Sequence, residues 1–342
     1  MRNYLLRSIP NFYAKIKIKD HHTFRISFNV LSDHILLLRQ VIDRPELTEE
    51  GPLLNQFIKD YCNRMAGRKM ETIRQQMNLP LEIEWIWHVH RLHPIAYYND
   101  CTKQLSDGQV LDKKICQVLK NFQFENDSIS RVSSMDSHSS FVPSTDLAKA
   151  AIRQRGFLEK FSKHSLYTQD LTEVKRSYFN SLVQNYVLFM KLAQKNSMIV
   201  PTFDIDLIWH THMRHPLQYH AASKALCGFV LDHNDAIETN VLLKAYKKTA
   251  EDWKNTYNTK YGEDIDRRYL ETKHVGGCAL VYDAMYWLWS DRDAWCEKIH
   301  GDYMLTCSSK STDNASGGDG SDGDGYGDSS GCGGDCGGCG GD

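Results

Sequence analysis

The feature that most constrains the fold is an internal repeat. Residues 85–97 recur as residues 207–219 at a constant offset of 122 positions. Both copies contain the pattern Ile-Trp-His-x-His-x-x-His-Pro, followed three residues later by Tyr. The identical positions are Ile86, Trp87, His88, His90, His93, Pro94 and Tyr97 in the first copy, and Ile208, Trp209, His210, His212, His215, Pro216 and Tyr219 in the second. Such a register does not arise by chance, so the sequence predicts a duplicated unit.

The similarity between the two copies continues on both sides of the histidine motif. Downstream, Gly108-Gln-Val-Leu-Asp112 corresponds to Gly228-Phe-Val-Leu-Asp232 at an offset of 120. Upstream, residues 79–85 align with residues 200–207, with one extra residue in the second copy. The duplication is therefore larger than the motif itself.

Apolar residues follow a helical period around both motifs. Steps of three and four residues predict helices over residues 24–41, 53–65, 171–193 and 236–257, the last one capped by Asn234 or Asp235. Strand-like alternation is clear only over residues 15–19. Pro94 and Pro216 fit the first turn of a second helix in each copy. We therefore predict an all-α fold of two tandem, pseudo-symmetric helical repeats that pack together.

Composition divides the 342-residue chain into five segments. Most of it is ordinary in composition, but residues 311–342 contain 13 Gly and 7 Asp without any Lys or Arg. Such a tail buries too little apolar surface to offset the entropy of ordering, so we expect it to be disordered. The predicted segments are an N-terminal helical region with the first repeat (1–124), a Ser-rich linker (125–145), the second repeat (146–262), an aromatic-rich strap (263–310) and the tail (311–342).

Charge and apolar run length exclude several functional classes. The longest apolar runs fall short of the roughly 18 residues that a membrane helix needs, so no membrane partner is expected. The cysteines before the tail are scattered and no secretion signal is visible, which favours reduced thiols in the cytoplasm or the nucleus. The tail carries −7 of a net charge of −2, which leaves about +5 on residues 1–310. That charge is too weak to predict nucleic-acid binding.

The duplicated histidines allow three interpretations: structural core, metal ligands or catalysts. Neutral imidazole is a common ligand of zinc, which makes His88, His90, His93, His210, His212 and His215 candidate ligands. Residues two apart point to opposite sides of a helix, whereas residues three apart share a face. A metal site would therefore combine one or two histidines from each copy across a pseudo-two-fold interface.

Two carboxylates stand four residues before a histidine, Glu84 before His88 and Asp206 before His210. This spacing lets a carboxylate orient an imidazole, as around a metal or a general base, and equally satisfies a buried histidine. No nucleophile signature or phosphate-binding loop accompanies the motif, so no catalytic residue is assigned and an enzyme is not favoured. In the tail, Cys332, Cys336 and Cys339 form a second candidate zinc site, beside the alternative of a passive tail.

The doubled Trp-His-x-His-x-x-His-Pro motif, together with the Gly/Cys tail, resembles the glycine-rich domain-containing proteins. The stretch from Phe28 to Met65 also resembles the N-terminal region of that family. The resemblance implies a non-enzymatic regulatory or interaction protein with a protein partner, acting in stress or developmental signalling. It also implies RNA binding as an alternative, although the Gly-Phe-x-Phe core of a ribonucleoprotein motif is absent from this sequence.

Overall fold

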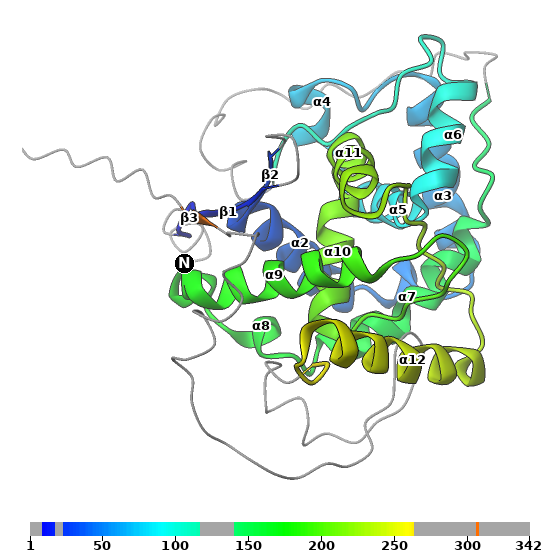
Figure 1. Ribbon diagram of the computed structural model, residues 1–342. Helices are drawn as coiled ribbons and strands as arrows, with labels where there is room; N and C mark the ends of the chain where they lie inside the picture. Colours follow the sequence, from blue (N-terminus) through cyan, green and yellow to red (C-terminus); the bar gives the residue numbers. More distant parts are fainter. Residues whose placement is uncertain (1–8, 18–22, 117–139, 263–305, 308–342) are drawn as a thin grey trace, which may run out of the picture. The chain divides into compact units, whose positions relative to one another are not determined.

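The computed structural model describes residues 9–17, 23–116, 140–262 and 306–307. Within these residues the chain is mostly helical, which confirms the predicted all-α class (Figure 1). Most of the predicted linker, nearly all of the aromatic-rich strap and the whole Gly/Asp/Cys tail lie outside the described residues. The helices are α2 (Phe28–Ile42), α3 (Pro52–Ala66), α4 (Ile73–Met77), α5 (Leu81–Arg91), α6 (Pro94–Gln104), α7 (Leu147–Phe161), α8 (Ser165–Thr168), α9 (Arg176–Leu192), α10 (Phe203–Met213), α11 (Pro216–Cys227) and α12 (Thr239–Tyr257).

A small antiparallel sheet adjoins α2. Its order is β2 (Thr23–Ser27), β1 (Tyr13–Lys17) and β3 (Thr306–Cys307). The predicted strand at 15–19 overlaps β1 over residues 15–17, while residues 18 and 19 lie outside the described residues. The helix predicted from Phe24 begins only at Phe28. The Ser27 side chain accepts a hydrogen bond from the Val30 amide and caps that helix. The alternation of exposed and buried residues before the cap belongs to the strand.

The two copies of the motif fold in the same way. In each, the Trp-His-x-His segment forms a helix of eleven residues, α5 or α10, and a second helix starts at the proline. His93 and His215 occupy the position before that second helix with nearly equal backbone angles, φ −111° and ψ 74° against φ −115° and ψ 78°. Proline fits there because the first helical turn needs no amide donor. The predicted helix, break and helix are confirmed in both copies.

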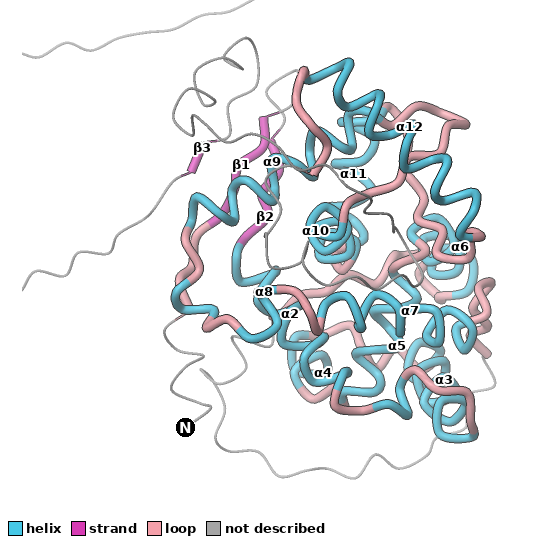
Figure 2. Tube along the Cα trace, turned by 90° about the horizontal axis from the view of Figure 1, so that it is seen from below, coloured by secondary structure: helices cyan, strands magenta, loops and turns pink. Residues whose placement is uncertain are grey.

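The two repeats meet around equivalent residues. The rings of Tyr98 on α6 and His220 on α11 stack with their centroids 4.6 Å apart, and their positions differ by the repeat offset. Helix α2 packs against both α5 and α10. Every residue of α10 is buried, and Figure 2 views this helix nearly end-on with other helices around it. The two motif helices therefore form the centre of the packing.

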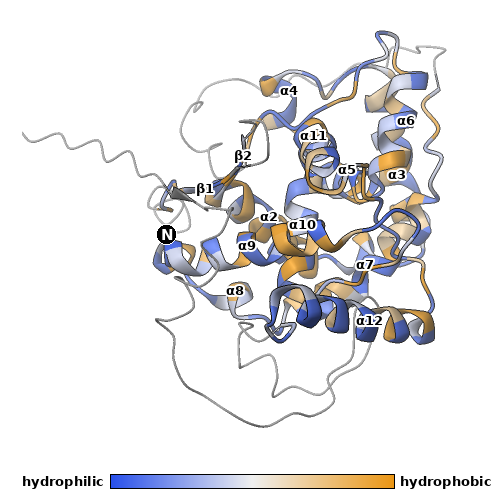
Figure 3. Cartoon of the chain, in the orientation of Figure 1, coloured by the Kyte–Doolittle hydropathy of each residue, from blue (hydrophilic) through white to orange (hydrophobic). Residues whose placement is uncertain are grey.

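Helix α12 lies at the edge and is amphipathic, as the mixed colours along it in Figure 3 show. It begins at Thr239 after Glu238, so the predicted cap at Asn234 or Asp235 is wrong. The Asp235 carboxylate instead accepts hydrogen bonds from Arg153 and Gln154 on α7. A buried ion pair outweighs a local capping preference here. In the described part of the chain, no helix combines the length and apolarity needed to cross a membrane.

Candidate functional site

One set of motif residues braces each repeat. The Trp87 indole donates to the Tyr97 hydroxyl at 2.9 Å, and that hydroxyl donates to the Leu111 carbonyl at 2.7 Å. The second repeat has the same chain of donors from Trp209 to Tyr219 to the Leu231 carbonyl. These buried bonds tie each helix pair to the segment that follows it. The Trp and Tyr of the motif therefore stabilise the fold.

The middle histidines of the motif, His90 and His212, also stabilise the fold. His90 and His212 each bond through Nδ1 to a buried tyrosine hydroxyl at 2.8 Å, that of Tyr61 and Tyr186 respectively. His90 Nε2 also lies 3.0 Å from an Asp100 carboxylate oxygen. Both rings contact tyrosines rather than the neighbouring motif histidines. The structure therefore does not bring them to a common metal position with His88 and His210.

The first histidines of the two copies face each other near the interface. The ring centroids of His88 and His210 are 6.3 Å apart, and both rings contact His34 of α2. His88 is fully buried, and neither of its ring nitrogens has a hydrogen-bond partner among the described residues. Burial, together with the charges of His34, Arg214 and Arg91, lowers the pKa of His88 well below its usual value. His88 is therefore neutral at pH 7.

Glu84 does not orient His88, contrary to the sequence-based expectation. Its carboxylate accepts hydrogen bonds from Lys113 Nζ at 2.7 Å and from Arg214 at 2.9 Å. Arg214 also bonds the Asp33 carboxylate at 2.6 Å. Burial alone would raise the pKa of Glu84, but Lys113, Arg214 and Arg91 lower it well below its usual range. Glu84 is the anion of a buried charge network.

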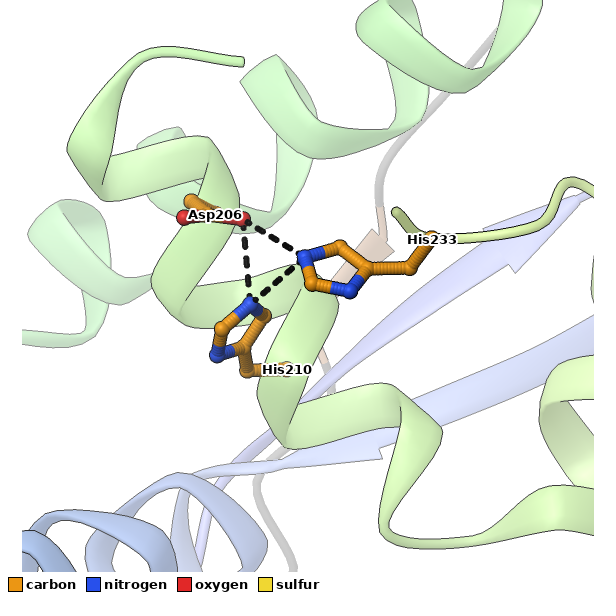
Figure 4. A group of neighbouring side chains, drawn as sticks. All are labelled: Asp206, His210 and His233. Carbon is orange, nitrogen blue, oxygen red and sulfur yellow. Dashed lines mark hydrogen bonds and ion pairs between the residues drawn. The ribbon is translucent and has the colours of Figure 1, made fainter. Parts of the chain in front are cut away.

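Asp206 lies beside its histidine, and a third residue joins the pair (Figure 4). Asp206 Oδ1 lies 3.3 Å from His210 Nε2, one helical turn away on α10. His233, in the segment after α11, places its Nε2 3.1 Å from His210 Nε2 and 4.0 Å from Asp206 Oδ1. All three side chains are at most 8% exposed. Three potential ligand atoms thus converge on one point.

These spacings match those around a tetrahedral metal ion. Zinc bonds to nitrogen and oxygen of about 2.1 Å place neighbouring ligand atoms about 3.4 Å apart. Burial, with the charge of His210, lowers the pKa of His233 to about 4, so this ring is unprotonated at pH 7. Burial would raise the pKa of Asp206, but the two histidines bring it below its usual value. In the described residues this is the one group of its kind whose atoms converge so closely.

His233 is the candidate ligand that the sequence motif does not contain. The repeat could have identified His233, because the alignment of Gly108–Asp112 with Gly228–Asp232 extends by one more position. At that position the first copy has Lys113 and the second has His233. The two residues have equivalent contacts, since each approaches the acid at the end of the first turn of its own motif helix. The alignment therefore pairs a lysine ammonium with an imidazole at the same place.

His93 and His215 are the last histidines of the motif, and each precedes the second helix of its repeat. His93 Nε2 is 4.0 Å from Asp235 Oδ1, a residue of the second repeat. His215 lies near Lys113, Arg214 and Arg91, and burial together with these three charges lowers its pKa well below the usual value. Each ring therefore faces the other repeat. Cys332, Cys336 and Cys339 lie outside the described residues.

Comparison with known proteins gives a family. Residues 110–222 match the family described as Glycine-rich domain-containing protein-like. Glycine-rich domain-containing protein 1 of Arabidopsis thaliana is 28% identical over 286 residues, which cover 72% of this chain and 34% of the relative. Glycine-rich domain-containing protein 2 of the same organism is 26% identical over 265 residues, 67% of this chain and 32% of the relative. The chain thus matches about a third of the length of these relatives. No solved structure matches.

Proposed function

We propose that this chain, which is similar to the glycine-rich domain-containing protein-like family, is a non-catalytic regulatory module that binds one transition-metal ion at Asp206, His210 and His233. The convergence of these three buried ligand atoms within 4.8 Å of one another carries the proposal. The wider role, in stress or developmental signalling through a protein partner, follows from the resemblance to the family. The burial of the ligands supports a structural or regulatory ion over a catalytic one, because a substrate has little access to them.

The donor set favours zinc. Two imidazole nitrogens and one carboxylate oxygen suit a borderline divalent ion, whereas calcium and magnesium prefer oxygen donors throughout. The Asp206 carboxylate also supplies a negative charge, which offsets part of the charge of the ion in a buried place. Cobalt and nickel fit the same ligands and serve as probes.

A bound ion would connect the segment around His233 to the core. Asp206 and His210 lie one turn apart on the fully buried α10, while His233 comes from the segment that precedes α12. A ligand that binds the folded state alone stabilises it by mass action. Metal occupancy would then control how firmly this segment, and α12 after it, is held. This is the regulatory element of the proposal.

A protein partner would have to bind away from the motif histidines. His88 and His210 are 0% and 1% exposed, so a partner cannot contact these rings in the folded protein. In our proposal the histidines act through metal binding and packing, and the partner contacts another surface.

Elemental analysis of the full chain, purified without chelator, tests the metal site. We expect about one equivalent of a transition metal in the wild-type protein and in a Cys332→Ser, Cys336→Ser, Cys339→Ser variant. Asp206→Asn and His233→Gln should lose the metal, whereas His220→Gln, a histidine outside the cluster, should keep it. Less than about 0.2 equivalents in the wild type after zinc addition and desalting would contradict the proposal.

A further inference from the structure

The three ligands leave one position of a tetrahedral ion free. Resting on the proposed function, we infer that His93 of the first repeat fills this position, so that the metal ion joins the two repeats. Three protein ligands with an open position are typical of catalytic zinc, and four are typical of structural zinc. The identity of the fourth ligand therefore decides what kind of site this is.

The position of His93 is fixed by the break between α5 and α6. Its backbone precedes Pro94, which starts α6, and its side chain is 12% exposed. His93 Nε2 has no hydrogen-bond partner among the described residues, and it lies 4.0 Å from Asp235 Oδ1. Asp235 follows the ligand His233 by two residues. The free nitrogen is therefore beside the segment that carries a ligand.

Electrostatic effects show the same proximity. Apart from burial and the nearby Asp235, the His210 ring is among the groups that affect the pKa of His93, and it lowers it. His93 in turn is among the groups that lower the pKa of His233, after burial and His210. His93 therefore lies near both imidazole ligands.

The Asp235 carboxylate is held by residues other than His93. It accepts hydrogen bonds from Arg153 at 2.9 Å and from Gln154 at 3.0 Å, both on α7. Those bonds hold Asp235 in place without the histidine. To bind the ion, His93 Nε2 turns away from Asp235 Oδ1, which lies 4.0 Å from it.

The first repeat contains the counterpart of this arrangement. There Glu84 takes the place of Asp206, Lys113 that of His233, and His215 comes from the opposite repeat as His93 does. The His215 Nε2 also lacks a hydrogen-bond partner in the described structure. Lys113 Nζ is 2.7 Å from Glu84, so this site already contains a cation supplied by the chain. An ammonium in the first repeat thus corresponds to the metal ion in the second.

Other contacts between the repeats are reciprocal as well. Burial raises the pKa of Asp112, and the Leu217 amide at the start of α11 is among the groups that lower it. In the same way, burial raises the pKa of Asp232, and the Ile95 amide at the start of α6 lowers it. An acid of each repeat therefore lies near the start of the second helix of the other. His93 likewise reaches from the first repeat toward the second.

Cobalt(II) binding to the full chain tests this inference, because its visible spectrum reports the number and type of ligands. All proteins compared, the reference called wild type included, carry Cys332→Ser, Cys336→Ser and Cys339→Ser, so that the tail thiols contribute no ligand. We expect His93→Gln to weaken cobalt affinity by at least about tenfold in a chelator competition and to change the spectrum toward higher coordination with water. The matched control is His215→Gln, the equivalent residue beside Lys113, which should leave affinity and spectrum unchanged. His93→Cys should add a thiolate-to-cobalt charge-transfer band that His215→Cys lacks.

The outcomes separate the inference from the proposed function. If the wild type does not bind cobalt and circular dichroism shows it folded, the metal site itself is wrong. If the wild type binds and folded His93→Gln keeps the same affinity and spectrum, the metal site stands and the role of His93 is overturned. If His93→Gln does not fold, the charge-transfer band of His93→Cys decides, since its absence in folded, cobalt-loaded protein overturns the inference.

Discussion

The two repeats use equivalent positions in different ways. Each places an acid at the start of its motif helix, a histidine one turn later and a basic residue on the segment that returns after the second helix. In the first repeat Lys113 and Arg214 neutralise Glu84 directly. In the second, Asp206 faces the rings of His210 and His233. A single exchange of lysine for histidine therefore changes a closed ion pair into a site suited to a metal ion.

Arg214 adds to the difference in charge between the sites around Glu84 and Asp206. It corresponds by the repeat offset to Leu92, so the second repeat supplies a cation for which the first has no equivalent. Its guanidinium crosses to Glu84 and Asp33 rather than to the acid of its own repeat. The first site thus receives cations from both halves of the chain. A duplicated backbone can thus keep its geometry while the charged side chains of its two copies differ in their partners.

The largest predicted effect concerns the acid of the first repeat. Glu84→Gln leaves Lys113, Arg214 and Arg91 with the Asp33 carboxylate as their remaining close acid in this network. Removing one partner of a buried ion pair costs about 3–5 kcal/mol of unfolding free energy. Denaturant titration should show this loss equally with and without zinc. A loss below about 1 kcal/mol would mean that the network does not stabilise the first repeat.

The same change in the second repeat should behave differently. Asp206→Asn removes the charge that attracts the ion, so the stabilisation by metal should disappear. At a free metal concentration of 100 times Kd, that stabilisation is about 2.7 kcal/mol. Without metal, we expect wild type and variant to differ by only about 1 kcal/mol. Thermal unfolding with zinc and with chelator measures both quantities, and a zinc-dependent stabilisation that survives in the variant would contradict the site.

Lowering the pH should destabilise the fold, because its buried histidines are neutral in the folded state. Burial lowers the pKa of His212 to about 3, and burial with the charge of His210 lowers that of His233 to about 4. An unfolded histidine has a pKa of about 6.5, so between pH 6.5 and 4 the unfolded state binds more protons. Stability should therefore fall as the pH falls through this range, by roughly 1 kcal/mol per pH unit for each such histidine.

The comparison of the repeats sharpens this prediction. Metal bound to His233 must be displaced before the ring is protonated, so zinc-loaded protein should keep its stability to lower pH than chelated protein. Urea unfolding at pH 7, 6 and 5 measures the slope in both forms. A flat profile in the chelated form would show that these histidines have the same pKa in the folded and unfolded states.

The smallest predicted effect tests the equivalence of the two repeats. Tyr97→Phe and Tyr219→Phe each remove the hydroxyl that links the motif tryptophan to a backbone carbonyl. Each should cost about 1–3 kcal/mol, because a buried carbonyl and an indole N–H lose a partner. The two variants should agree within about 0.5 kcal/mol in chelator. A larger difference would show that the braces are not energetically equivalent.

Sequence patterns predicted the parts of the fold that depend on local chemistry. Apolar periodicity and the His-Pro break define α5, α6, α10 and α11, because proline and helical spacing act within one or two turns. The start of α12 was not predictable in this way. Asp235 forms a distant ion pair with Arg153 on α7, and this contact overrides its local preference for capping.

The candidate site shows the same limit. The pair of Asp206 and His210 follows from spacing on one helix, and the sequence analysis identified it. Their meeting with His233 depends on how the segment after α11 returns to α10, which no local pattern encodes. Likewise, Glu84 has the same spacing to His88 as Asp206 has to His210, yet Lys113 and Arg214 take its carboxylate. Spacing shows which groups can pair, and tertiary packing determines which of them do.

Anomalous diffraction at the zinc edge, from crystals of the zinc-loaded full chain, locates the bound ion. We predict one strong peak about 2.1 Å from Nε2 of His210 and of His233 and from an Asp206 carboxylate oxygen. We also predict the Lys113 ammonium, without a peak, beside Glu84 in the first repeat. A peak at Glu84 and His88, or the absence of one at Asp206, His210 and His233, would contradict this prediction.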